Sequence, residues 1–188
     1  MIRSTAFLLA TALLATHPAG AASDSDKGIK FNFENAEITS VLTTYSNVSG
    51  QKFVIDPSVR GKISILSKKN VSIAEAFDLL STALALNQFA ISEQGDTMVV
   101  ASTRNIQRSL IPVLRELPPL KPERMVTMVF QLKNASVEEI NKTLRILPSK
   151  DGEMTPYAAG NQLIVNDWVS NIHKIAKVLA EIDQPKSK

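Results

Sequence analysis

The chain contains no cysteine, which excludes a disulfide framework, a lipidated cysteine and a thiolate metal site. Aromatic residues are scarce, at 5%. The longest apolar stretch, residues 6–15, is shorter than the roughly 18 apolar residues that a membrane-spanning helix needs. The formal net charge of +3 gives no strong attraction to nucleic acid or anionic lipid. We therefore expect neither a transmembrane protein nor a nucleic-acid-binding protein.

The N-terminus has the three-part pattern of a secretory signal peptide. Arg3 supplies a positive charge, residues 6–15 supply the apolar core, and an A-x-A cleavage site ends at Ala21. We predict a signal peptide over residues 1–21, cleaved after Ala21, and a periplasmic location for the rest of the chain. The polar segment 22–28 is expected to be disordered.

Sequence patterns that carry catalysis or cofactor binding are also missing. Outside the predicted signal peptide, His173 is the only histidine, and we expect it to be a lone surface residue on the polar side of the last helix. The chain has no G-x-S-x-G motif, and its glycines are too scattered to form a G-x-G-x-x-G phosphate loop. We therefore assign no catalytic, cofactor-binding or metal-binding residue, and we predict that the protein is not an enzyme.

Apolar periodicity predicts an α+β fold made of two small domains. In the first half, alternating apolar residues indicate strands, and apolar residues three and four apart indicate helices. The expected order is β-α-β-β-α-β-β, with strand 29–34, helix 38–48, strands 52–55 and 62–66, helix 73–84 and hairpin strands 88–92 and 97–102. We place the first domain at residues 29–102.

The periodicity fails over residues 103–124, where prolines are interspersed with basic residues. Prolines at this density remove backbone donors and fix φ. We predict a Pro-rich basic linker, solvated and extended, with a short helical turn around residues 106–110. Its positive charge could meet an acidic partner or a phosphate, but such residues more often simply keep a linker soluble.

The second half is predicted to be a KH-like β-α-β-β-α domain over residues 125–184, followed by a tail over residues 185–188. Its expected elements are strand 126–132, helix 137–147, hairpin strands 154–158 and 163–165, and helix 168–182. KH domains clamp nucleic acid with a G-x-x-G loop, which this chain lacks. We expect Trp168 to lie in the core on the apolar face of the last helix, and we leave the role of Tyr157 open.

Three strand-to-helix junctions share a pattern in which an asparagine precedes an apolar residue. In a capping box, a serine accepts from the backbone N–H three residues on, while a glutamate there reaches back to the serine. Ser72 and Glu75 have this spacing, and so do Ser136 and Glu139. The first junction lacks the serine, so Asn35 itself is expected to cap. Reuse of one strand-helix device without catalytic residues favours an assembly or docking module.

The first domain resembles the N-terminal domain that bacterial secretins share with the signalling segments of TonB-dependent receptors. This resemblance is carried by the first strand with Asn35-Ala36, by residues 53–57 and 59–64, and by Asn70-Val71-Ser72. The second domain resembles the ring-building repeat of secretins. The matching residues there are 129–135, 160–165 and 179–183.

The resemblance to type II secretins implies a periplasmic vestibule. Its first domain would meet inner-membrane components and cargo, and its second domain would pack against copies of itself, so a homo-oligomer is one expected state. The chain stops at Lys188, where a secretin would continue into further ring domains and an outer-membrane pore. We therefore expect a stand-alone accessory protein or a shortened paralogue, without pore activity, associated with the outer-membrane secretin complex.

The leading hypothesis is a non-enzymatic periplasmic interaction module of a type II-like secretion or pilus-type machine, with a secretin, an inner-membrane component or cargo as partner and no cofactor. The candidate partner-binding residues are Lys30, Asn32, Glu34, Lys62 and Ser64. A strand edge at these positions would accept a partner strand, although charged residues there equally serve to block unwanted pairing. The alternative is a periplasmic signalling or regulatory module related to the receptor signalling domain, and an enzyme is a distant third.

Overall fold

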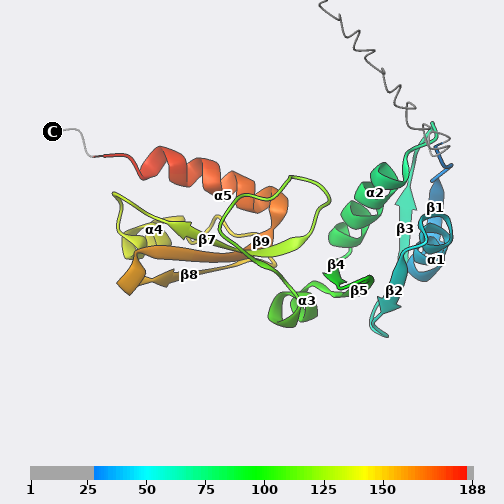
Figure 1. Cartoon of the computed structure of the whole chain (residues 1–188), viewed down its shortest axis with the longest axis horizontal. Helices are drawn as coiled ribbons and strands as arrows, with labels where there is room; N and C mark the ends of the chain where they lie inside the picture. The colour runs from blue at the N-terminus through cyan, green and yellow to red at the C-terminus, as the bar shows by residue number, and fades with distance from the viewer. Residues whose placement is uncertain (1–27, 186–188) are drawn as a thin grey trace, which may run out of the picture.

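The structure, a computed structural model, describes residues 28–185. The predicted signal peptide, most of the predicted disordered segment and residues 186–188 of the tail lie outside the described residues. In the described part, one group of helices and strands forms each end of an elongated molecule, and the short helix α3 lies between them (Figure 1).

The order of elements confirms the predicted order in both halves. The first half contains β1 (Phe33–Glu37), α1 (Ile38–Ser49), β2 (Lys52–Ile55), β3 (Lys62–Ile65), α2 (Ile73–Leu86), β4 (Phe89–Gln94) and β5 (Thr97–Ser102). The second half contains β7 (Met125–Gln131), α4 (Val137–Leu144), β8 (Glu153–Tyr157), the 3₁₀ helix η1 (Ala158–Gly160), β9 (Gln162–Trp168) and α5 (Val169–Ile182). Between the halves lie α3 (Thr103–Ser109) and β6 (Val113–Leu114).

The first half is built from two small sheets that share one core. β2 runs parallel to β5, and β4 runs antiparallel to β5, which gives the order β2-β5-β4. β1 and β3 form a separate antiparallel pair. The helices contribute Leu42, Tyr45, Leu80 and Leu84, all buried, to the common core, where they meet Ile63 of β3. Each buried side chain of this size contributes about 1.5–3 kcal/mol, so this core is what joins the two sheets.

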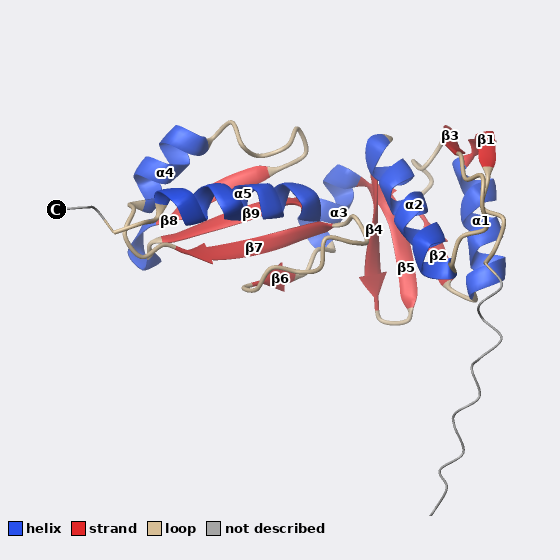
Figure 2. Ribbon diagram, turned by 90° about the horizontal axis from the view of Figure 1, so that it is seen from above, coloured by secondary structure: helices blue, strands red, loops and turns tan. Residues whose placement is uncertain are grey.

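The second half is a four-stranded sheet of order β6-β7-β9-β8, with α4 and α5 on one face. Figures 1 and 2 show α5 lying along this sheet. Alternate residues of β7, among them Val126 and Met128, are buried against Ile140 of α4 and Ile172 of α5. The period of two in the strand and the amphipathic stripe in each helix therefore predicted this buried face correctly.

The first strand begins later than predicted. Ile29 makes only an isolated bridge with Val71, with backbone N–O distances of 2.8 and 2.9 Å, and β1 starts at Phe33. The predicted alternation still describes burial, because Phe31 is buried and its polar neighbours are exposed. Alternation in a sequence shows which face is buried, whereas pairing depends on a partner strand elsewhere in the chain.

The capping box predicted at the start of α2 is confirmed. The backbone N–H of Glu75 donates to Ser72 Oγ at 3.2 Å, and the N–H of Ser72 donates to Glu75 Oε2 at 2.8 Å. The backbone N–H of Ser72, followed by the Ser72 hydroxyl, holds the pKa of the Glu75 carboxyl below its ordinary value. Two backbone donors that the helix leaves unpaired are thus satisfied by neighbouring residues.

The capping box predicted at the start of α4 is wrong. Ser136 is the N-cap residue, but its side chain accepts no backbone hydrogen bond. Its hydroxyl donates instead to Glu138 Oε2 at 2.7 Å. The N–H of Val137 donates to Oδ1 of Asn161 at 2.9 Å, so a distant side chain takes the role that was predicted for the local pair of Ser136 and Glu139.

The cap predicted at Asn35 is also wrong. The N-cap position of α1 is Glu37, without a side-chain hydrogen bond. Asn35 lies within β1 at φ 50°, where the register with β3 shifts between Phe33 and Ala36. Asparagine enters the left-handed region more readily than most residues, so Asn35 forms an irregularity in the strand rather than a helix cap.

The segment 103–124 contains a short helix, α3, where a helical turn was predicted, but the rest differs from the extended, solvated linker that the sequence predicts. α3 begins directly after β5 and buries Ile106 completely. β6 pairs in parallel with β7, with Val113 opposite Thr127. The proline content correctly predicts little regular structure after α3, but it gives no indication that the segment packs onto its neighbours.

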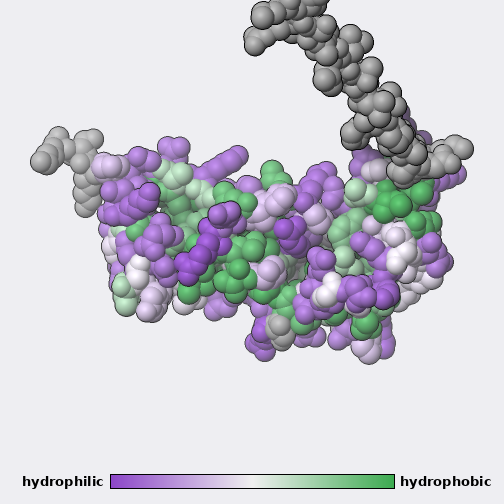
Figure 3. All heavy atoms as spheres, viewed as in Figure 1, coloured by the Kyte–Doolittle hydropathy of each residue, from purple (hydrophilic) through white to green (hydrophobic). Residues whose placement is uncertain are grey.

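His173 is not the lone surface residue that the sequence predicts. It is half-buried, and its Nε2 lies 2.7 Å from the carbonyl oxygen of Pro118. The side chain therefore links α5 to the proline-rich segment 112–124. Figure 3 shows apolar surface in the middle of this face of the molecule, and the exposed apolar residues of the segment are Val113, Leu117 and Leu120.

The proline-rich segment also contacts both halves of the chain through polar groups. Towards the second half, the Ser170 hydroxyl donates to Glu123 Oε1 at 2.7 Å. Towards the first half, Lys121 Nζ lies 3.7 Å from Asp78 Oδ2 on α2. Each such exposed contact contributes about 0–1 kcal/mol. Together they hold the segment along the molecule instead of leaving it in solvent.

Candidate partner-binding surface and interdomain junction

The five predicted partner-binding residues lie around the two-stranded sheet β1-β3, and all five are exposed. Glu34 lies on β1, Lys62 and Ser64 lie on β3, and Lys30 and Asn32 lie in the segment before β1. The antiparallel pairing of β1 with β3 brings positions 30 residues apart in the sequence onto one surface. The predicted residues therefore lie on this strand pair or in the segment that precedes it, and we call them together the β1-β3 surface.

Two of these side chains take part in the fold itself. Ser64 Oγ accepts a hydrogen bond from the Asn35 N–H at 2.9 Å. Asn32 Oδ1 accepts one from the Ser67 N–H at 3.0 Å. Both bonds join the first segment to β3 close to the register shift, where the ladder is interrupted. Ser64 and Asn32 therefore stabilise the surface as well as lying on it.

The other three side chains, Lys30, Glu34 and Lys62, make no ion pair within residues 28–185. Sequence reasoning missed an apolar neighbour, Leu66, which follows β3 and is 75% exposed. The signal was available, because buried Ile63 and Ile65 place positions 62, 64 and 66 on the opposite, outward face. The β1-β3 surface thus combines charge with one exposed apolar side chain.

Each strand of this sheet has one unpaired edge among the described residues, because the sheet contains only β1 and β3. The edge of β1 is interrupted by the register shift between Phe33 and Ala36. Such irregularities twist a strand and discourage further pairing. The extra residue lies in β1, because Phe33 and Ala36 pair with Ile65 and Ile63 of β3, so β3 offers the better edge to an added strand.

A buried carboxylate organises the second half near the junction. Asp167 on β9 is fully buried, and it accepts hydrogen bonds from Ser149 N at 2.8 Å, Ser149 Oγ at 2.6 Å, Trp168 N at 2.8 Å and Asn171 Nδ2 at 2.5 Å. A carboxylate is tolerated inside a protein only with this many donors. A Cβ at position 152 would collide with it, so Gly152 is required there.

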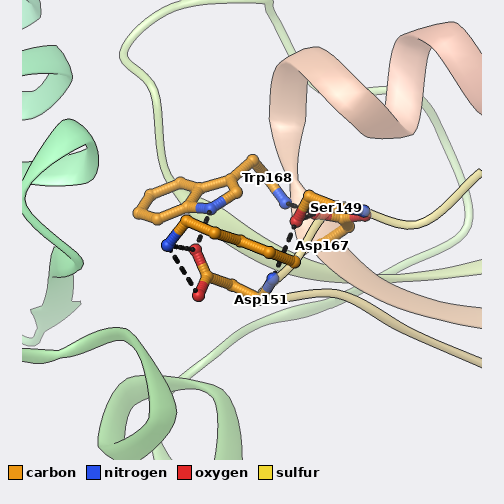
Figure 4. A network of polar contacts seen from close by, with 5 residues as sticks. Ser149, Asp151, Asp167 and Trp168 are labelled. Atoms are coloured by element: carbon orange, nitrogen blue, oxygen red, sulfur yellow. Dashed lines mark hydrogen bonds and ion pairs between the residues drawn. The ribbon is translucent and has the colours of Figure 1, made fainter.

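Trp168 lies beside this carboxylate and is buried in a core cluster, as predicted, but it does not lie on the helix. It is the last residue of β9 and the N-cap of α5, not a member of the helix face. Its indole N–H donates to Asp151 Oδ2 at 3.4 Å, and the same carboxylate pairs with Lys150 Nζ at 3.1 Å. Figure 4 shows the side chains of Trp168 and Asp151 extending towards the ribbon of the first half.

An apolar cluster joins the two halves. Ala90 and Ala101 come from β4 and β5, Ile106 comes from α3, and Met125 and Trp168 come from the second half. Ile106 and Met125 are at most 2% exposed, and burying residues of this size contributes about 1.5–3 kcal/mol each. The halves therefore meet through a packed junction, which the sequence did not reveal because its members lie far apart in the chain.

The groups on these surfaces are of the kinds that bind a partner. Within residues 28–185, no three histidine, cysteine or acidic side chains lie close enough together to hold a metal ion. No helix in this part of the chain has both the length and the apolar character needed to cross a membrane. What the described residues offer is exposed strand edges, charged side chains and scattered apolar residues.

Two small α+β units, joined by a packed junction and carrying exposed strand edges, define a class of structural and interaction domains. Family comparison gives this class its name. Residues 31–100 match the GspD-like N0 domain, and residues 127–188 match the bacterial type II/III secretion system short domain. The chain therefore carries a GspD-like N0 domain and a type II/III secretion system short domain, the two domains found in the N-terminal regions of type II secretins.

Individual relatives agree with this assignment. The chain is 28% identical to secretin XcpQ of Pseudomonas aeruginosa over 83% of its own length and 23% of that protein. It is 30% identical to the type IV pilus biogenesis and competence protein PilQ of Neisseria meningitidis over 84% of its own length and 22% of that protein. The chain thus spans about a quarter of the length of the curated relatives it matches. The matched regions are the periplasmic N-terminal domains of outer-membrane secretins.

A solved structure supports the fold. The Klebsiella pneumoniae type II secretion system outer membrane complex, which contains PulD, PulS and the PulC HR domain, matches with a TM-score of 0.70 at 21% identity. The match covers 81% of this chain and 26% of that chain. The α+β fold of both halves is therefore that of secretin N-terminal domains.

Proposed function

We propose that this chain is a non-enzymatic periplasmic interaction module of a type II-like secretion machine or of a pilus-type machine. It docks through the β1-β3 surface to a secretin, to an inner-membrane component or to cargo. The observation that carries this proposal is the conjunction of two secretin-type domains with a β3 edge that is unpaired within its two-stranded sheet.

The relatives support a secretion or pilus machine as the setting. One is a secretin, and another is a protein of type IV pilus biogenesis and competence. The alternative, a signalling module like the receptor segment, uses only the first kind of domain. The match of residues 127–188 to the secretion-system short domain therefore favours the machine.

The chemistry of the β1-β3 surface supports protein docking. Lys62 and Glu34 offer charges of both signs, and Leu66 offers an apolar contact. An added strand on β3 would gain backbone hydrogen bonds, while the outward side chains would select the partner. This combination fits an extended segment of a protein better than a small molecule, for which a concave pocket is usual.

The proposed location and boundaries follow from the same assignment. A signal peptide over residues 1–21 would deliver the chain to the periplasm. Domains over residues 29–102 and 125–184 are supported by two apolar clusters, because the buried residues of each cluster fall within one of these ranges. N-terminal sequencing of the exported protein should find Ala22 as the first residue. An uncleaved chain would contradict this part of the proposal.

Photocrosslinking tests the docking surface. A photoreactive amino acid replaces Lys62 or Leu66 in cells that express the secretion or pilus machine, with Lys142 on α4 as an exposed control position. We expect adducts with a secretin, an inner-membrane component or a secreted substrate, identified by mass spectrometry, from positions 62 and 66 but not from position 142. Absence of such adducts from both test positions would overturn the proposal.

A further inference from the structure

A large hollow lies where the two halves meet. It is an open groove of about 950 Å³, a size typical of ligand sites. From the first half it is lined by the end of α2, the start of β4 and α3, and from the second half by the loop before β8 and by β9. It is therefore formed only when the junction is intact, and it lies apart from the β1-β3 surface.

The wall from the first half is rich in hydrogen-bond donors. Arg104 and Arg108 lie four residues apart on α3, both line the groove, and neither forms an ion pair within residues 28–185. Residues four apart on a helix lie side by side, so the two guanidinium groups can act on one ligand. Thr103, also lining the groove, is only 3% exposed, and its hydroxyl has no hydrogen-bond partner.

The wall from the second half is rich in acceptors. Asn166 on β9 lines the groove, and its Oδ1 is buried without a hydrogen-bond partner. Glu153, the first residue of β8, lies opposite Asn166 in the strand pair and lines the same groove. Lys150 and Asp151 also contribute to this wall, but they neutralise each other in an ion pair.

Unpartnered buried polar groups are uncommon, and leaving them so is unfavourable. Here two of them line one groove, one able to donate and one able only to accept. A ligand that satisfies both must carry a donor for Asn166 Oδ1 and a donor or an acceptor for the Thr103 hydroxyl, which can bond either way. The cations of Arg104 and Arg108 beside Thr103 favour an acceptor there, and an anionic one.

We propose that this groove binds an extended peptide segment of a partner protein through an acidic side chain. The carboxylate lies against Arg104, Arg108 and the Thr103 hydroxyl, and a peptide N–H donates to Asn166 Oδ1. A phosphate diester of a nucleic acid or a fully ionised inorganic anion has no donor for Asn166 Oδ1, whereas a peptide carries backbone N–H groups beside its acidic side chain. The groove thus adds a second protein-recognition site, independent of the β1-β3 surface.

The chain supplies its own reporter for this site. Trp168 is the only tryptophan, and its indole contacts Asp151, which lines the groove. Binding beside Asp151 should therefore change the tryptophan emission. The probe is a capped pentapeptide, Ala-Ala-Glu-Ala-Ala, titrated into the full chain, with Ala-Ala-Gln-Ala-Ala as the neutral control. We expect a saturable change with the glutamate peptide and affinity at least about tenfold lower for the glutamine peptide.

Variants separate recognition from folding. The double variant Arg104→Gln/Arg108→Gln should lower affinity at least about tenfold, whereas Arg115→Gln, an exposed arginine outside the groove, should leave it unchanged. Thr103→Val removes only an unpartnered hydroxyl, so it should weaken peptide binding without lowering the melting temperature.

The proposal is overturned if neither peptide gives a saturable change, or if the double arginine variant binds as well as the parent chain. It is also overturned if inorganic phosphate or free glutamate binds as tightly as the glutamate peptide, since the groove would then be an anion or amino-acid site. Substitution of Lys62 on the β1-β3 surface should leave peptide binding intact, so failure of one site is distinguishable from failure of the other.

Discussion

The helices α2 and α4 begin from nearly the same sequence, Asn-Val-Ser in one and Asn-Ala-Ser in the other, yet different groups hold their first turns. At α2 the bonds are local, between Ser72 and Glu75. At α4 the partner of the Val137 N–H is Asn161, 24 residues away. The comparison teaches that a local motif fixes where a helix begins, whereas tertiary contacts decide what stabilises that start.

The strand-to-helix junction before α4 is held from a third part of the chain as well. The carboxylate of Asp183, the residue after α5, accepts from the backbone N–H groups of Lys133 at 2.8 Å, Asn134 at 2.6 Å and Ala135 at 2.8 Å. Partial burial raises the pKa of Asp183, but these three donors outweigh that effect and hold the pKa below its ordinary value. The end of the last helix thus fixes the start of α4.

Among the variants that test this comparison, the largest loss of unfolding free energy is expected for substitution of Asn161. Its Oδ1 accepts from Val137, and its Nδ2 donates to the carbonyls of Leu132 and Ala135 at 3.1 and 3.0 Å. Its backbone is left-handed, at φ 47°. Asn161→Ala loses three hydrogen bonds and strains the backbone, so the free energy of unfolding should fall by about 3 kcal/mol in urea denaturation.

Asn161→Gly is the matched control, because glycine accepts the left-handed backbone but lacks the amide. Its loss should be about 2 kcal/mol, and the difference between the two variants measures the backbone strain. If both variants cost less than about 0.5 kcal/mol, within the range of an ordinary surface change, Asn161 does not stabilise the junction.

Asp183→Ala should cost about 2 kcal/mol in the same urea experiment. Three N–H groups lose a charged acceptor, but Asp183 is only half-buried, so water replaces part of the interaction. Glu181→Ala, an exposed acid on α5, is the control and should change the free energy of unfolding by less than about 0.5 kcal/mol. If the two substitutions lower the free energy of unfolding equally, the stabilisation comes from negative charge near the end of α5 and not from the three hydrogen bonds of Asp183.

The same carboxylate should make stability depend on pH. Because the pKa of Asp183 is lower in the folded state than in the unfolded state, its contribution is present above the unfolded value of about 3.9 and is lost as pH falls through the folded value. The difference in unfolding free energy between the parent chain and Asp183→Asn should therefore be constant near neutral pH and shrink below about pH 4. A difference that grows on acidification would contradict this assignment.

Ser72→Ala should cost about 1 kcal/mol, because α2 has a local capping box and the serine is its acceptor. Ser72→Asp retains an acceptor at the same position and should restore most of the stability. Urea denaturation of the three proteins provides the measurement. If both variants lose about 1 kcal/mol of unfolding free energy, the hydroxyl is needed for something other than capping.

The sequence predicted the elements well because their signals are short-range. Alternation in β7 and the apolar stripes of α2 and α5 each lie within one segment, and so does the Ser72 capping box. The family resemblance was also readable, since its motifs keep their order along the chain. What local patterns could not supply is the partner of each segment, and so the start of β1 at Phe33 and the role of Asn35 were missed.

The junction was missed for the same reason. Ile106 sits in a proline-rich stretch and Trp168 at the end of a strand, and neither position indicates the other. The interdomain groove depends on that contact, so no motif predicts it. The β1-β3 surface was partly predictable, because outward positions on β3 follow from period two, yet the same rule should also have identified Leu66.

Ser136→Ala tests the difference between the two helix starts most directly, because its expected loss of unfolding free energy is the smallest. A local capping box would make it as costly as Ser72→Ala, about 1 kcal/mol. In the structure, the Ser136 hydroxyl donates to the exposed Glu138 and accepts no backbone hydrogen bond, so the loss in urea denaturation should stay within about 0.5 kcal/mol. A loss equal to that of Ser72→Ala would mean that a local serine cap stabilises both helices, and that Asn161 does not stabilise the start of α4.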